Sequence, residues 1–251
     1  MVGWAETKAR IKEFYGFNQH EYYSLTVVIL VTAFVFSFND WGGEVFNLIQ
    51  GLENLWWMVL VVAITFFFRL SCQKIYGLAE GHKVEFKPWW TGVIIMVVLA
   101  FMSAGISRGK FVLPLFLVGG VSISLMIKQR LGEFRYGFSN WEQGIISMWG
   151  VYANLILAIL FAIGVFAWPQ SYFFKQGLYF NLILPLCGLI PIPQQEGLNI
   201  IFAARWLYLA AFILILLAAV LLLTHTFGGL IFAVVFATVF GLIYILIGSE
   251  K

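Results

Sequence analysis

Long apolar runs separated by short polar segments dominate the chain. Runs long enough to cross about 30 Å of hydrocarbon at about 1.5 Å per residue fall at 22–38, 55–71, 89–107, 145–168, 177–193, 200–223 and 227–247. The pattern predicts an all-α polytopic membrane protein with about six or seven transmembrane helices. No long linker, low-complexity tract or clear repeat divides the sequence, so we expect one integral domain over 1–251.

The run 111–127 differs from the other apolar runs. It contains Pro114 and a Gly-Gly pair and then alternates polar and apolar residues, a pattern typical of a strand. We weigh a small β-hairpin on the membrane surface, around 111–140, against an eighth span.

The N-terminal 20 residues predict a short amphipathic helix on the membrane surface. Charged residues precede the first apolar run, so no cleavable signal peptide is expected. The loop 39–54 has no Lys or Arg, whereas 72–88 carries Lys74, Lys83 and Lys87. Because positive loops stay in the cytoplasm, we expect a cytoplasmic N-terminus and a protein integral to the cell membrane.

The composition mainly excludes other classes of protein and of catalytic site. With 62% hydrophobic and 11% charged residues, the chain cannot cover a water-facing globule, and a net charge of +3 is too small to suggest nucleic acid. The single aspartate, Asp40, rules out a pair of intramembrane aspartates. The three histidines have no i, i+4 spacing for a zinc ion: His20, His82 and His225.

A few polar residues fall at membrane depth, where one charge costs about 2.5–3.5 kcal/mol: Arg69, Gln73, Asn154, Asn181, Glu196 and Arg205. Arg69 either extends to the cytoplasmic interface or points into the bundle together with Gln73, which shares its helix face. Glu196 is the carboxylate that both could reach. Arg205 is a rival partner for it.

The segment GLIPIPQQEGLN predicts a broken helix, because Pro185, Pro191 and Pro193 cannot donate backbone hydrogen bonds. Backbone groups freed in this way must be satisfied inside the protein or beside a cavity. The QQE triplet, 194–196, is therefore either a loop leaving the membrane or part of a buried site.

Four patches in order resemble the site-two intramembrane metalloproteases, above all their compact archaeal branch, over nearly the full chain. The opening FNQHEYYSLTVVILVTAFVFSF is similar to the archaeal first span. The stretch RLSCQKIYGLAEGHKVEF, in a helix expected at 55–86, is similar to the family's HExxH helix. There the later Gly81, Glu85 and Phe86 match the family pattern.

The other two patches carry the remaining family positions. ISMWGVYANLILAIL, in the run 145–168, resembles the family's GPxxN helix and keeps Gly150 and Asn154, with Val151 in place of the proline. CGLIPIPQQEG, in the broken helix 177–197, resembles FNLLPIPPLDG. Gly188 stands in place of the asparagine, and Gln194 and Gln195 replace Pro–Leu. Four residues match the family pattern: Pro191, Ile192, Pro193 and Gly197.

The departures from the family fall at its catalytic positions. The resemblance places Arg69 and Gln73 at the two ligand histidines, Leu70 at the general-base glutamate and Glu196 at the aspartate ligand. Hydrolysis needs zinc and a base, whereas a guanidinium only donates hydrogen bonds and repels a cation. We therefore predict no catalytic residue and no zinc, and an ion-pair and polar cluster of Arg69, Gln73 and Glu196 instead.

The leading functional hypothesis is a pseudoprotease that binds or regulates transmembrane segments of other membrane proteins, using the run 111–140 as a strand edge. An alternative is an active metalloprotease with a remodelled site, which requires His82, Cys72 or Glu80 near Glu196. A second alternative is a small transporter whose site includes Arg69 and Glu196.

Overall fold

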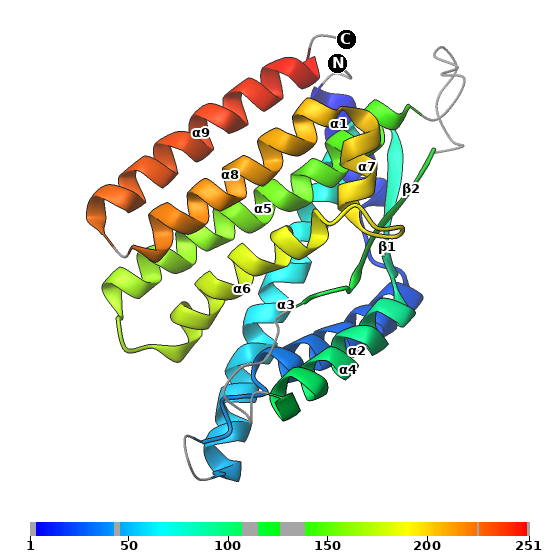
Figure 1. The fold of residues 1–251 in the computed structure, drawn as a ribbon. Helices are drawn as coiled ribbons and strands as arrows, with labels where there is room; N and C mark the ends of the chain where they lie inside the picture. Colours follow the sequence, from blue (N-terminus) through cyan, green and yellow to red (C-terminus); the bar gives the residue numbers. More distant parts are fainter. Residues whose placement is uncertain (1–3, 43–45, 107–114, 126–138, 225, 250–251) are drawn as a thin grey trace.

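The computed structural model describes residues 4–42, 46–106, 115–125, 139–224 and 226–249 (Figure 1). Within these ranges the elements are, in chain order, α1 (Trp4–Phe14), α2 (Gln19–Phe36), α3 (Leu48–Ala79), β1 (His82–Pro88), α4 (Trp90–Ile106), β2 (Gly119–Leu125), α5 (Asn140–Ala167), α6 (Tyr172–Gly188), α7 (Glu196–Ala203), α8 (Arg205–Leu223) and α9 (Phe227–Ser249).

Three of the described helices are long and apolar enough to cross a membrane: α3, α5 and α8. Shorter apolar helices occupy Trp90–Ala104 and Phe227–Leu242. The prediction of a mostly helical membrane protein is confirmed at this level.

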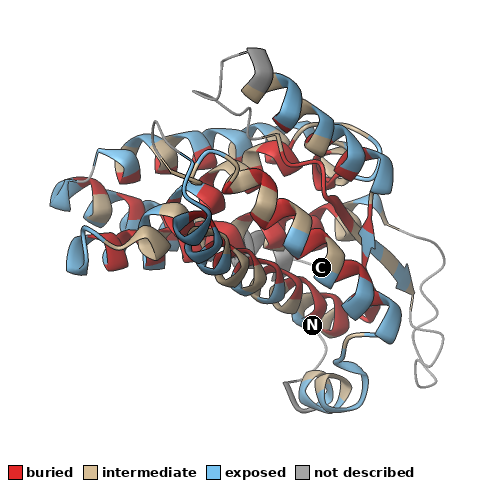
Figure 2. Cartoon of the chain, turned by 90° about the horizontal axis from the view of Figure 1, so that it is seen from below, coloured by how far each residue is buried: buried red, intermediate tan, exposed pale blue. Residues whose placement is uncertain are grey.

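The helices form two groups on either side of α3. Figure 1 shows α5, α6, α8 and α9 side by side in one layer, and α2 paired with α4 on the other side of α3. The helix α5 lies inside this arrangement, and its buried face includes Ile146, Val151 and Leu155. Figure 2 shows the buried residues gathered between the helices.

The outer faces of the peripheral helices are apolar. On α8, Leu209, Ile213 and Val220 are each more than half exposed. A water-facing protein rarely presents such a continuous apolar surface, and hydrocarbon chains would cover it in a bilayer. The exposed apolar face of α8 therefore agrees with its length and apolar composition, which are those of a membrane span.

The small sheet corrects the expected hairpin. The strand β2 lies within the predicted 111–140 region, but it pairs antiparallel with β1, from Pro88↔Gly119 to His82↔Leu125. Most of the remaining 111–140 region falls outside the described residues. The alternation in GGVSISL thus identified a strand. Its partner, β1, was not predicted, because KVEF lies at the end of the helix expected at 55–86, although these residues also alternate between apolar and polar.

The helix expected at 55–86 also differs from the structure. The observed α3 begins earlier, where the Asn47 side chain accepts hydrogen bonds from the backbone N–H groups of Ile49 and Gln50 at 3.2 and 3.3 Å. It ends at Ala79, and Gly81 then adopts a φ of 82°, a conformation that favours glycine. Gly81 therefore terminates the helix and starts β1.

The run 200–223, expected as one span, is divided in the structure. Ala204 is extended, with φ −163° and ψ 130°, and separates the short α7 from α8. The broken helix of the sequence analysis is present: α6 ends at Gly188, and a turn leads to α7 at Glu196.

Candidate functional site

The side chains of Arg69, Gln73 and Glu196 meet inside the helical bundle. Arg69 Nη2 lies 2.6 Å from Glu196 Oε2, and Gln73 Nε2 donates a hydrogen bond to Glu196 Oε1 at 2.8 Å. The exposed fractions of the three residues are 4%, 0% and 2%. Of the two orientations considered for Arg69, the structure has the inward one.

Two elements position this cluster. Arg69 and Gln73 are four residues apart on α3, so they project from one face on successive turns. Glu196 is the first residue of α7, where the helix dipole favours a negative charge. Gln194, two residues earlier, has a φ of 70°, which a non-glycine residue seldom adopts. The backbone turns at Gln194 and re-enters the bundle, so that Gln195 and Glu196 are buried.

Glycines provide the space that the cluster occupies. A Cβ on Gly150 would lie 2.8 Å from Glu196 Oε2 and 3.0 Å from Arg69 Nε, and closer still to Gln73 Nε2. A Cβ on Gly188 would lie 3.4 Å from Arg69 Nη2. Gly197 allows α7 to contact the Leu189 backbone. A longer side chain at position 188 would therefore meet the guanidinium of Arg69.

The other predicted polar residues fall into two environments. Asn181 is satisfied, since its Nδ2 donates to Thr65 Oγ1 at 3.0 Å and to Gly177 O at 2.9 Å. Asn154 is fully buried one turn after Gly150, and neither its Oδ1 nor its Nδ2 has a hydrogen-bond partner within the described ranges. Arg205 is exposed, and Glu196 pairs with Arg69 instead of with it.

The donor set at Glu196 does not fit a zinc ion. Zinc needs side chains with lone pairs, such as imidazole, thiolate or carboxylate. Arg69 offers only N–H donors, and the nitrogen of the Gln73 amide is the atom that faces the carboxylate. In the described part of the chain no three His, Cys, Asp or Glu side chains are grouped closely enough to hold a metal. His82, considered for a remodelled site, has its Nε2 3.3 Å from Glu142 Oε2.

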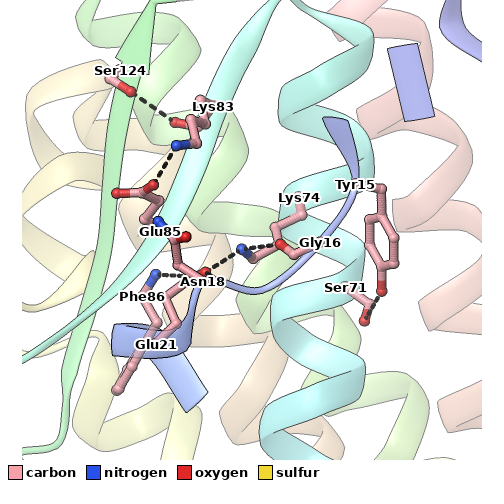
Figure 3. A network of polar contacts seen from close by, with 10 residues as sticks. All are labelled: Tyr15, Gly16, Asn18, Glu21, Ser71, Lys74, Lys83, Glu85, Phe86 and Ser124. Atoms are coloured by element: carbon pink, nitrogen blue, oxygen red, sulfur yellow. Dashed lines mark hydrogen bonds and ion pairs between the residues drawn. The ribbon is translucent and has the colours of Figure 1, made fainter. Parts of the chain in front are cut away.

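Sequence reasoning missed a second buried ion pair, shown in Figure 3. Lys74 Nζ lies 2.9 Å from Glu21 Oε2, and Glu21 Oε1 accepts a hydrogen bond from the Phe86 N–H at 2.7 Å. Glu21 precedes a long apolar run and Lys74 follows one, so each looked like an ordinary interfacial charge. Nothing in the sequence shows that the two meet.

A small cavity adjoins the cluster on the side of the sheet. It has a volume of about 150 Å³ and lies between β2 and the turn before α7, lined in part by Ser122, Gln194, Gln195 and Asn199. A Cβ on Gly120 would lie 3.1 Å from Gln194 O and 3.4 Å from Glu196 Cγ. The start of β2 therefore lies next to the first residue of α7, Glu196.

Fold and site together define a helical membrane protein with a buried ion pair at the end of a broken helix. No family model, no curated protein and no solved structure matches this chain.

Proposed function

We propose that this chain is a non-catalytic relative of the site-two intramembrane metalloproteases that holds transmembrane segments of other membrane proteins. The observation that supports the proposal is the contact of Arg69 and Gln73 with Glu196. The resemblance assigns these positions to metal ligands. A fixed positive charge and an amide there link α3 to α7, but they supply no Lewis acid and no base for hydrolysis.

The edge of β2 suggests how a segment is held. Phe86 directs its N–H away from β2 to Glu21, so Phe86 and Val121 form a non-hydrogen-bonded pair, and Val121 and Ile123 direct their backbone groups to the far edge. Across the described residues, no hydrogen bond satisfies these two N–H groups. An extended peptide could add to this edge, next to the cavity at Gln195.

Site-specific photo-crosslinking tests this function. With a photoreactive residue at the exposed Ser122, we expect crosslinks that mass spectrometry maps to a transmembrane segment of another protein. Val121→Pro removes one outward N–H, so it should abolish these crosslinks. The control places the photoreactive residue at Ser124 and carries Ser122→Ala, which keeps every backbone N–H and should leave the crosslinks unchanged. A photoreactive residue at the exposed Leu209 of α8 is the control. Equal labelling from Ser122 and Leu209 would refute specific binding at β2.

The topology that we propose has seven spans, with α2, α4, α6 and α9 crossing the bilayer in addition to α3, α5 and α8. The N-terminus is cytoplasmic, and the protein lies in the cell membrane. Single cysteines at the exposed positions Lys12 and Glu53 test the orientation. An impermeant thiol reagent added outside intact cells should label position 53 and leave position 12 unlabelled. The reverse labelling would contradict the topology.

A further inference from the structure

A cavity of about 250 Å³ lies at the end of α3, away from the Arg69–Glu196 pair. Its walls are the end of α1, the linker 15–18, the last turns of α3 and the first half of β1. A cavity of about 150 Å³ is large enough to admit benzene, so this one has room for a polar headgroup. Figure 3 shows the linker passing across α3.

The inner wall of this cavity contains a buried ion pair. Lys74 Nζ lies 2.9 Å from Glu21 Oε2 and donates a hydrogen bond to Gly16 O at 2.9 Å, and it lies 4.5 Å from the centroid of the Phe17 ring. The side chains of Lys74 and Glu21 are only 6% and 5% exposed. They therefore keep the linker in place and present charge of both signs to the interior.

The mouth of the cavity also carries both signs. Lys83 Nζ lies 2.6 Å from Glu85 Oε1, with 54% and 38% of these side chains exposed, and Glu13 is exposed and has no ion-pair partner among the described residues. Three glutamates and two lysines thus line the cavity in all. A purely anionic ligand would meet more like charge than opposite charge, whereas a zwitterion can place each of its charges against an opposite one.

An apolar stripe on α3 continues from the cavity. Phe67 and Ile75 are 37% and 43% exposed, and they lie four residues on either side of Ser71, whose Oγ is 2.8 Å from the Tyr15 hydroxyl. Residues 67, 71, 74 and 78 follow one another at helical spacing, and Lys74 and Leu78 line the cavity. Polar cavity and apolar stripe therefore form one continuous amphiphilic surface.

We propose that this surface binds one phospholipid with a zwitterionic headgroup that ends in a primary ammonium. The phosphate lies near Lys83 at the mouth, the ammonium faces Glu13, and the acyl chains follow the stripe over Ser71 and Phe67. A primary ammonium donates hydrogen bonds to carboxylates, which a trimethylated one cannot do. This inference requires only that α3 lies in a bilayer, and it does not depend on the function proposed above.

Native mass spectrometry of the full chain in detergent tests the specificity. We expect phosphatidylethanolamine to bind about tenfold more tightly than phosphatidylglycerol or phosphatidylcholine of the same acyl chains. Soluble glycerophosphoethanolamine at equal concentration should not displace the lipid, because it lacks the part that contacts the stripe. Equal binding of the three lipids, or displacement by the soluble headgroup, would overturn the assignment.

Exposed charges allow the cavity to be altered without disturbing the fold. Glu13→Gln combined with Lys83→Gln should weaken phosphatidylethanolamine binding about tenfold. The matched control combines Lys12→Gln with Glu53→Gln, two exposed charges outside the cavity, and should bind like the wild type. An equal loss of binding in both double variants would show nonspecific attraction and overturn the proposal.

Discussion

Arg69 Nη2 and Glu196 Oε2 lie 2.6 Å apart inside the protein. If either residue were removed, the charge of the other would be left without water to solvate it. A buried pair of this kind contributes little net stability compared with apolar side chains of similar volume. Removing one partner is costly, however, because the other charge is left buried. The contact between α3 and α7 therefore depends on both residues.

We predict that Arg69→Met and Glu196→Gln each lower the free energy of unfolding by about 3–5 kcal/mol. The double variant should recover much of that loss, because no isolated charge remains. Unfolding measured in detergent or by steric trapping gives the coupling energy of the cycle. The control cycle at the exposed Lys83 and Glu85 should show about 0–1 kcal/mol. Harmless single substitutions with no coupling at Arg69 and Glu196 would show that the pair is absent.

Gly150 permits α5 to approach the ion pair. In Gly150→Ala the added methyl must displace Gln73, Glu196 or Arg69, so we predict a loss of about 1–3 kcal/mol in the free energy of unfolding. In Gly228→Ala, on α9, the new Cβ meets nothing within 4 Å, and stability should stay the same or rise slightly. Thermal unfolding of both variants checks this, and an unaffected Gly150→Ala protein would argue against the close approach.

Glu21 connects three elements: its own α2, α3 through Lys74, and β1 through the Phe86 N–H. Because this N–H points away from β2, the carboxylate also closes that edge of the sheet. A change at Glu21 should therefore loosen β1 without directly touching the Arg69–Glu196 pair.

We predict that Glu21→Ala speeds amide hydrogen exchange at Phe86 by roughly tenfold or more, since the N–H loses its acceptor. Glu85→Ala should leave exchange at Phe86 near the wild-type rate, because that partly exposed side chain pairs with Lys83. Exchange measured by mass spectrometry on peptides covering β1 distinguishes the two variants. Similar protection of β1 in Glu21→Ala and wild type would contradict the role of Glu21.

Asp40 connects the loop after α2 to other elements. Its Oδ2 accepts hydrogen bonds from Tyr172 and Gln176, and its backbone carbonyl accepts one from Asn54. Burial raises the pKa of the Asp40 carboxyl above its ordinary value of 3.8, and the opposing effect of the Tyr172 hydrogen bond is smaller. Between 3.8 and the raised pKa, the folded chain therefore binds more protons than the unfolded chain.

The stabilisation from protonated Asp40 is consequently present in acid and is lost as pH rises through the raised pKa. We predict that the free energy of unfolding of the wild type, minus that of Asp40→Asn, decreases as pH rises from 3.8 towards neutrality. Glu53→Gln, which removes an exposed carboxylate, should show no such trend. A difference that increases with pH would mean that the charged carboxylate is the favoured form.

Across the whole molecule, the hydrophobic pattern predicted most helices well. The expected run 89–107 corresponds to α4 at Trp90–Ile106, and 145–168 lies within α5, apart from one residue. Periodicity could not locate the end of α3, because the turn at Gly81 depends on one backbone conformation. It also could not pair β1 with β2, which are joined across α4, since strand pairing at that separation leaves no local signal.

The composition of the ion-pair cluster could be predicted because few polar residues fall at membrane depth and because Arg69 and Gln73, four residues apart, share one helix face. Arg69, Gln73 and Glu196 do come together. The Lys74–Glu21 pair could not be predicted, because interfacial charges are common and their partners depend on how the N-terminal linker crosses α3. The amide of Asn154 has no hydrogen-bond partner among the described residues, and this depends on packing that no spacing rule reveals.

The proposed function requires that Glu196 pairs with the guanidinium of Arg69 and binds no zinc ion. Elemental analysis of the purified full chain after zinc loading and removal of free metal tests it, with wild type compared with Glu196→Gln. We predict that wild type retains no more zinc than the variant. Near-stoichiometric zinc that is retained by wild type and lost in Glu196→Gln would contradict the claim.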